Sequence, residues 1–250
     1  MVPAELSALK IRYQAAKKAL AAKKLSAVGS QLEKAIKEQG KAIISTSFDF
    51  LWEWLILGTV AYESYRRQLI NGARKRAAFA NDVRRSSVDS YLFGSEPDIV
   101  YAALSVNERG LSSYGNVTAV LRSKSIADRT VALEMNSFDF TTMAASNGWS
   151  VEKPLPAGYL SSWNEKHKLG LIKNKGVMEK PLEHNILCDL VLHSEGNRAT
   201  DRFIELYIFG RIIAAAVEKI TLPLAFVSGL DALSLARLAE LKRKFTIEEY

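Results

Sequence analysis

Cysteine is almost absent from this sequence. The single Cys188 excludes an internal disulfide, and it fits a reducing compartment such as the cytoplasm. Zinc-spaced Cys/His sets, Gly-rich phosphate loops that open a helix and Gly-x-Ser-x-Gly elbows are missing too, which disfavours the enzyme classes that depend on them. The three histidines, His167, His184 and His193, are spread along the chain, so we expect no metal site.

Long hydrophobic runs are also lacking. The apolar run from Leu51 to Ala61 is too short to span a bilayer, and it contains Glu53. The first residues, Met-Val-Pro-Ala-Glu-Leu, have no apolar stretch after a basic start. We therefore expect no transmembrane segment and no conventional signal peptide.

What the chain has in excess is positive charge near its start. Residues 1–90 hold 16 Lys and Arg against 8 Asp and Glu, whereas residues 91–250 hold 18 against 19. Such asymmetry suggests an anionic partner, namely a nucleic acid, an acidic protein or a membrane surface. Lys-rich helices that simply keep the chain soluble are the alternative. The densest basic stretch, residues 66–85, contains Arg66, Arg67, Arg74, Lys75, Arg76, Arg84 and Arg85.

The pattern of residues changes from helical to strand-like along the chain. Helices are predicted over residues 4–25, 30–40 and 48–70, the last with Ser47 or Asp49 as its cap. After a loop at residues 86–97, β-rich runs are predicted over residues 98–106, 114–122, 129–140, 186–193, 202–210 and 219–227, and a last helix begins at Ser228 or Asp231. The predicted fold is α+β, with a basic helical region (residues 1–90) followed by a compact β-rich domain (residues 91–250).

The run from Arg202 to Gly210 predicts the most informative strand. Side chains alternate across a strand, so Ile204, Leu206 and Ile208 share an aliphatic face. The other face carries Glu205 among the aromatic rings of Phe203, Tyr207 and Phe209. A lone carboxylate in such surroundings occurs at catalytic sites and also in structural ion pairs.

Several short motifs occur in a recognisable order. They are Pro97-Asp98-Ile99-Val100-Tyr101-Ala102-Ala103-Leu104, Tyr114-Gly115-Asn116-Val117, Val120-Leu121-Arg122, Asp128-Arg129-Thr130, Asn136-Ser137 and Phe203-Ile204-Glu205-Leu206-Tyr207-Ile208-Phe209-Gly210. This series resembles that of a family of bacterial toxin-like domains similar to mono-ADP-ribosyltransferases. The chain departs from the family at Asn136, Tyr207 and Phe209, where the family has Asp, Gln and His.

The resemblance implies a compact β-rich transferase domain that uses NAD as co-substrate. Glu205 would be the catalytic carboxylate, opposing positive charge on the ribose as the nicotinamide bond breaks. Arg122 would bind the pyrophosphate, Ser137 the ribose, and Tyr101 or Tyr114 would stack on nicotinamide. A degenerate, inactive copy of the family is the alternative for this domain.

The expected function is that of a toxin or effector which transfers ADP-ribose to a macromolecule, either in the cytoplasm or after delivery into a target cytoplasm. Protein, RNA and DNA are all open as acceptors, and a basic border formed by residues 66–85 would favour a nucleic acid, most readily RNA. An antitoxin, chaperone or immunity protein is an expected partner for such a toxin. The rival hypothesis is a non-catalytic protein whose basic helices bind an anionic partner.

Overall fold

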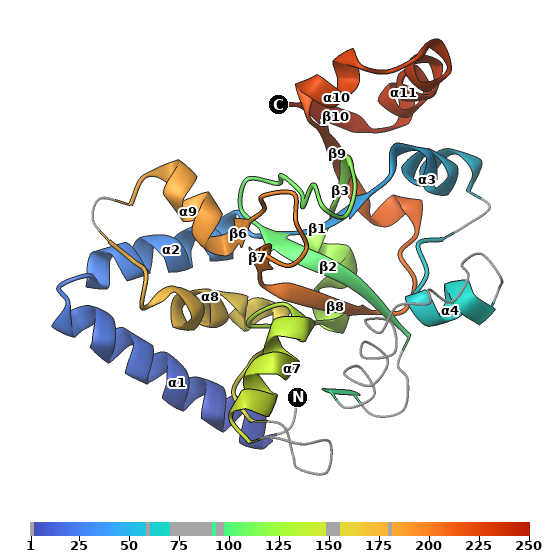
Figure 1. Ribbon diagram of the computed structural model, residues 1–250. Helices are drawn as coiled ribbons and strands as arrows, with labels where there is room; N and C mark the ends of the chain where they lie inside the picture. Colours follow the sequence, from blue (N-terminus) through green and yellow to red (C-terminus); the bar gives the residue numbers. More distant parts are fainter. Residues whose placement is uncertain (1–2, 59–60, 71–91, 94–97, 149–155, 180–181) are drawn as a thin grey trace.

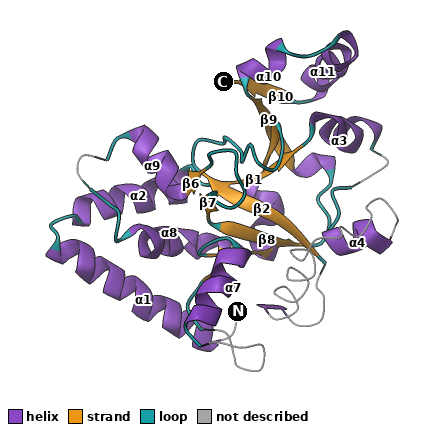
Figure 2. Cartoon of the chain, in the orientation of Figure 1, coloured by secondary structure: helices purple, strands orange, loops and turns teal. Residues whose placement is uncertain are grey.

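The computed structural model describes residues 3–58, 61–70, 92–93, 98–148, 156–179 and 182–250 (Figure 1). It mixes helices with one large sheet (Figure 2). The longer helices are α1 (Pro3–Ala22), α2 (Ser26–Glu38), α7 (Ser137–Ser146), α8 (Lys166–Asn174), α9 (His184–Val191) and α11 (Ala232–Lys244). Shorter ones are α3 (Phe48–Trp52), which continues as a π-helical turn (Glu53–Leu57), α4 (Tyr65–Ile70), α6 (Ser123–Ile126) and α10 (Leu224–Ser228).

The sheet has eight strands in the order β10-β9-β3-β1-β2-β8-β4-β5. Their bounds are β1 (Lys41–Thr46), β2 (Ile99–Ser105), β3 (Val117–Leu121), β4 (Thr130–Leu133), β5 (Leu160–Ser162), β8 (Glu205–Phe209), β9 (Val217–Leu222) and β10 (Thr246–Glu249). All neighbours are antiparallel except β10 and β9. A separate pair joins β6 (Leu192–His193) to β7 (Arg202–Phe203).

Among the described residues, the two faces of this sheet belong to different hydrophobic clusters. Ile44, Ala102 and Leu206 belong to the main hydrophobic core, together with residues of α1, α2, α8 and α9. The alternate residues of the same strands belong to two smaller clusters, one around Ile43 and Phe203 and the other around Tyr207. We call these the core face and the open face of the sheet.

Close helix packing completes the core face. Gly170 of α8 lies where Ile36 of α2 and Ile204, just before β8, both approach, and a Cβ there would meet Cδ1 of Ile36 at 2.2 Å. On α1, Leu9, Ala16 and Leu20 are buried, as the helical spacing predicts. Figure 1 shows α1, α2 and α8 lying side by side.

The position of β1 corrects the expected division of the chain near residue 90. Residues 41–46 pair with β2 on one side and β3 on the other, so the N-terminal part supplies a strand in the interior of the sheet. The reason is that Ala42 and Ile44 bury one side of this strand and Ile43 buries the other. Residues 1–90 are therefore not a helical region separate from the β-rich part.

Other elements also differ from their predicted form. The helix that begins after Ser47 ends at Gly58, whose φ of +64° is left-handed, instead of reaching residue 70 in one piece. The run over 129–140 stops as a strand at Leu133, because Asn136 caps α7 by accepting a hydrogen bond from the N–H of Phe138 at 2.9 Å. The run over 186–193 is mostly α9, since Leu187 and Val191 are buried at helical spacing.

Candidate functional site

A pocket of about 750 Å³ lies on the open face of the sheet. Its floor is formed by β1, β2 and β8, with Ser45, Tyr101, Ala103 and Glu205 among the lining residues. Two loops reach over it, one containing Leu111 and Tyr114 and the other residues 197–199. Among the described residues, this face carries two small hydrophobic clusters, and the pocket lies beside them.

Glu205, the carboxylate expected from the sequence to be catalytic, lines this pocket. The residue is 3% exposed, and its Oε2 accepts hydrogen bonds from the backbone N–H of Ser137 at 2.8 Å and from the hydroxyl of Tyr207 at 3.0 Å. Ser137 is the first residue of α7, so the positive end of that helix faces the carboxylate. Oε1 accepts no hydrogen bond from the described residues, which leaves it available to a ligand.

The strand pairing explains why there is open space next to the carboxylate of Glu205. Ala103 of β2 and Leu133 of β4 are the residues paired with Glu205 in the sheet. Because Ala103 carries only a methyl group, the open face is hollow next to the carboxylate. Glu205 also shares its face with Phe203 and Tyr207, as the strand alternation predicts.

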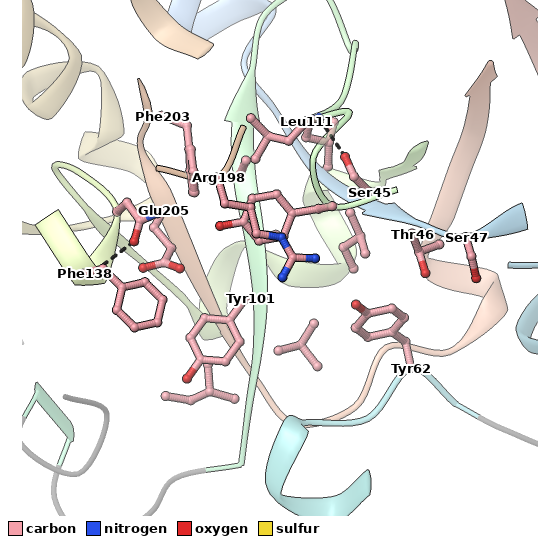
Figure 3. A pocket seen from close by; sticks show the side chains of 18 of the residues that line it. Ser45, Thr46, Ser47, Tyr62, Tyr101, Leu111, Phe138, Arg198, Phe203 and Glu205 are labelled. Atoms are coloured by element: carbon pink, nitrogen blue, oxygen red, sulfur yellow. Dashed lines mark hydrogen bonds between the residues drawn. The ribbon is translucent and has the colours of Figure 1, made fainter. Parts of the chain in front are cut away.

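Aromatic rings flank the carboxylate along the strands. Tyr101 is paired with Tyr207, and their ring centroids are 5.7 Å apart. Tyr114 lies on the other side of the pocket, with its ring edge-on to Phe203 at 6.2 Å. Tyr101 and Tyr114, the two rings singled out from the sequence, therefore line the same pocket as Glu205. Figure 3 shows Tyr101 close to Glu205 in that pocket.

Among the described residues that line this pocket, Arg198 is the one with a cationic side chain. Its guanidinium lies 4.6 Å from the ring centroid of Tyr114, and its Nε donates to the carbonyl oxygen of Ser113 at 3.0 Å. These contacts use the face of the guanidinium and one N–H. The terminal amino groups make no hydrogen bond to the described residues, and they are suited to binding an anion. Figure 3 shows the guanidinium and the carboxylate of Glu205 directed into the same space.

The turn that carries Arg198 is fixed by local hydrogen bonds. The side-chain oxygen Oδ1 of Asn197 accepts a hydrogen bond from the N–H of Ala199 at 3.0 Å. The backbone carbonyl oxygen of Asn197 accepts one from the N–H of Asp201, also at 3.0 Å. Asp201 is 1% exposed and accepts a hydrogen bond from the hydroxyl of Ser113. The two loops that cover the pocket are thus joined to each other, which positions Arg198 before any ligand binds.

Two residues expected from the sequence are placed differently. Arg122 follows β3 at the end remote from Thr46, and it is not among the described residues that line the pocket. Ser137 does lie beside Glu205, but its side chain is buried, and it is the backbone N–H that makes the contact. Of the basic stretch, residues 66–70 belong to α4, whereas residues 71–85 lie outside the described residues.

Additional charged groups lie near the start of α7. Asp139 lines the pocket; partial burial raises the pKa of its carboxyl, and the charge of Lys173 opposes that rise. Burial lowers the pKa of Lys173 to about 8, and its Nζ is shielded from solvent with no hydrogen-bond partner among the described residues. Behind them, Arg12 forms an ion pair of 2.6 Å with Glu134, whose pKa is raised by burial.

Arg198 and the hydroxyl-bearing residues Ser45, Thr46 and Ser47 also line the pocket, and none of them was predicted from the sequence as a site residue. The signal for the turn was present, because Gly196-Asn197 is typical of a tight turn and Gly196 has a φ of +79°. The glycine of the Tyr114-Gly115 motif has a structural reason. A Cβ at Gly115 would meet the carbonyl oxygen of Thr46 at 2.1 Å, so only glycine lets this loop approach β1.

No protein-family model matches the chain, and no curated protein matches it either. No group of three or more His, Cys, Asp or Glu side chains within the described ranges could hold a metal ion. No helix in the described part of the chain is long and apolar enough to cross a membrane.

Proposed function

We propose that the protein is an ADP-ribosyltransferase that uses NAD as co-substrate and transfers ADP-ribose to a macromolecule. The observation that carries this proposal is Glu205, whose Oε2 is held by two donors while Oε1 remains available within a pocket of about 750 Å³. That volume falls within the range of small-molecule sites. The order of motifs around Glu205 supports the same conclusion.

The chemistry would break the bond between C1′ of the ribose and the nicotinamide nitrogen. Nicotinamide leaves with the bonding electrons, and C1′ develops positive charge before an acceptor oxygen or nitrogen bonds to it. The fixed carboxylate of Glu205 opposes that charge, and a ribose hydroxyl can donate to Oε1. Asp139 lines the same pocket and is available to take up the proton that the acceptor loses.

The pyrophosphate would bind to Arg198 in this proposal, in place of Arg122. The terminal amino groups of Arg198 suit two phosphate oxygens, and its guanidinium is already stacked on Tyr114. The rings of Tyr101 and Phe138 lie on the Glu205 side of the pocket, where they would flank the nicotinamide (Figure 3). The hydroxyl groups of Ser45 and Ser47 line the opposite side and can bind sugar oxygens.

The deciding experiment supplies the purified protein with NAD labelled in its adenylate part, with and without a lysate of whole cells. We expect release of nicotinamide in both mixtures and transfer of label to macromolecules in the second. Treatment of the labelled products with protease or nuclease then distinguishes protein from RNA as acceptor. If neither nicotinamide release nor NAD binding is detected, the pocket has another ligand and the proposal fails.

A further inference from the structure

The first two helices carry an exposed cluster of positive charge. Seven lysines are exposed there, three on α1, two in the turn after it and two on α2: Lys10, Lys17, Lys18, Lys23, Lys24, Lys34 and Lys37. We call this set the lysine face. Within the described part of the chain, none of these lysines forms an ion pair.

The acidic residues of the same helices do little to neutralise this face. Glu33 is 8% exposed and accepts a hydrogen bond from the hydroxyl of Tyr13 at 2.5 Å. Glu5 accepts from the N–H groups of Gly158 and Leu160, both at 2.8 Å. Two of the three carboxylates on these helices are therefore engaged with the protein, and Glu38 is the exposed one.

The neighbouring helix α8 adds little exposed charge to this face, because Lys166 is buried and Lys168 is paired with Glu165. Burial, and after it the charges of Lys37, Lys168 and Lys166, lower the pKa of His167 to about 4. The lysines of α2 and α8 are thus close enough to act on one buried group. A cluster of exposed charges of mostly one sign, such as the seven lysines of the lysine face, attracts a polyanion and speeds its encounter with the protein.

The lysine face lies away from the pocket. Helices α1, α2 and α8 cover the core face of the sheet, whereas the pocket is on the open face. A polyanion bound to these lysines would not occupy the place of the small-molecule ligand. The charge of the N-terminal helices therefore calls for a role separate from the chemistry at Glu205.

The composition of the face favours a nucleic acid over a protein partner. Lysine is depleted from the cores of protein–protein interfaces, which rely on aromatic, Met and Arg anchors. From residue 3 to residue 38 the sole aromatic is Tyr13, whose hydroxyl is bonded to Glu33. Leu6 and Ile11 are the large apolar side chains exposed on α1, and the remaining exposed positions on α1 and α2 are small or polar.

The lack of exposed rings also bears on the kind of nucleic acid. Proteins that bind single strands combine a cationic track with aromatic rings on which bases stack. The lysine face has the charges without the rings, which suits contact with phosphates alone. From Lys10 to Lys24 the lysines extend over about 20 Å, at a rise of about 1.5 Å per residue. A duplex segment of that length carries about 12 phosphate charges.

We propose that the lysine face binds the phosphate backbone of a nucleic-acid duplex, on the side of the sheet opposite the pocket. Binding is independent of sequence and falls steeply as salt rises, because each phosphate contact releases condensed counterions. It would hold the protein on DNA or structured RNA while leaving the pocket open.

The test measures binding of the full chain to two fluorescent probes, a duplex of DNA and a duplex of RNA with the same sequence, over a range of KCl concentrations. The variant Lys10→Ser/Lys17→Ser/Lys18→Ser removes three charges from the face. The control Lys124→Ser/Arg243→Ser/Lys244→Ser removes three exposed charges from elsewhere. Net charge is therefore the same in the two variants.

We expect the plot of log binding constant against log KCl concentration to have a slope shallower by about 3 in the face variant, at about 0.9 per lost phosphate contact. Its affinity for the duplex at low salt should be at least about tenfold weaker. The control should keep the wild-type slope, and the relative affinities for DNA and RNA will show which duplex is preferred. Equal slopes for the two variants, or tighter binding to polyglutamate or to anionic lipid vesicles than to either duplex, would overturn the proposal. Nicotinamide release measured in parallel should be unchanged in the face variant, so this test and that of the transferase proposal fail separately.

Discussion

Replacing Glu205 by glutamine separates the charge of this side chain from its structural role. The glutamine oxygen can take the place of Oε2 and still accept from Ser137 and Tyr207, while the amide nitrogen replaces Oε1. Two charge-assisted hydrogen bonds become neutral ones, which are about half as strong. With about 1 kcal/mol of net stability per neutral bond, the variant should lose about 1–2 kcal/mol of folding free energy.

The effect on catalysis should be much larger than the effect on folding. Removing one fixed electrostatic stabiliser typically slows turnover by about 100- to 1,000-fold, so Glu205→Gln should reduce kcat for nicotinamide release by at least about 100-fold. The dissociation constant for NAD, measured by calorimetry, should change much less, because the charge acts on the transition state.

Two further variants test whether the charge of Glu205 is what accelerates the reaction. Tyr207→Phe removes one donor to Oε2 but keeps the carboxylate, and it should slow nicotinamide release by about tenfold or less. Glu205→Leu removes the side-chain acceptor of the buried Ser137 N–H and should lower stability by a further ~1–2 kcal/mol. Turnover within threefold of wild type in a folded Glu205→Gln protein would show that this carboxylate is not the catalytic group.

The other predictions concern ligand binding and pH. Arg198→Ala should weaken NAD binding by about tenfold in calorimetry, whereas Arg122→Ala, outside the pocket, should bind NAD normally; the reverse outcome would restore Arg122 as the pyrophosphate ligand. Because the pKa of His167 is about 4 in the fold, the unfolded chain binds more protons than the native one between about pH 4 and 6.5, so stability should fall as pH falls through this range, by up to about 3 kcal/mol. Denaturant titrations of His167→Gln should lose that slope, whereas those of His193→Gln should retain it. Lys173→Met should raise the thermal midpoint at pH 7, because it replaces a buried ammonium that lacks a hydrogen-bond partner among the described residues; a lower midpoint would mean that its attraction to Glu134 and Asp139 outweighs its burial.

Local pattern was enough to predict some elements of the fold. The alternation of Ile204, Leu206 and Ile208 against Phe203, Glu205 and Tyr207 is confirmed, because side chains of a strand can only point to one face or the other. The residues of β2 lie within their predicted strand. The caps formed by Ser47 and Asp231 are confirmed as well, since each side chain accepts a hydrogen bond from an N–H of the turn that follows it.

Other elements depended on partners that lie far away in the sequence. Residues 41–46 gave no clear sign that they would lie between β2 and β3, because pairing partners more than 50 residues away are not encoded in a local pattern. The short apolar run of α9 fits a strand or a buried helix equally well. Its packing against α8 and β2 decided for the helix.

The sequence by itself determined that Glu205 shares a strand face with aromatic rings, and that basic charge is concentrated in the first 90 residues. Only the tertiary structure decided what surrounds these features. Arg198 reaches the pocket because the turn at Asn197 is joined to Ser113 through Asp201. Arg122 is not among the described lining residues, because it follows β3 at the end remote from Thr46. The lysines of α1 and α2 lie on the opposite side of the sheet from Glu205, because their apolar stripes are buried on the core face. Alternation and helical periodicity act between near neighbours, whereas the approach of distant loops and the choice of sheet face are set by packing of the whole chain.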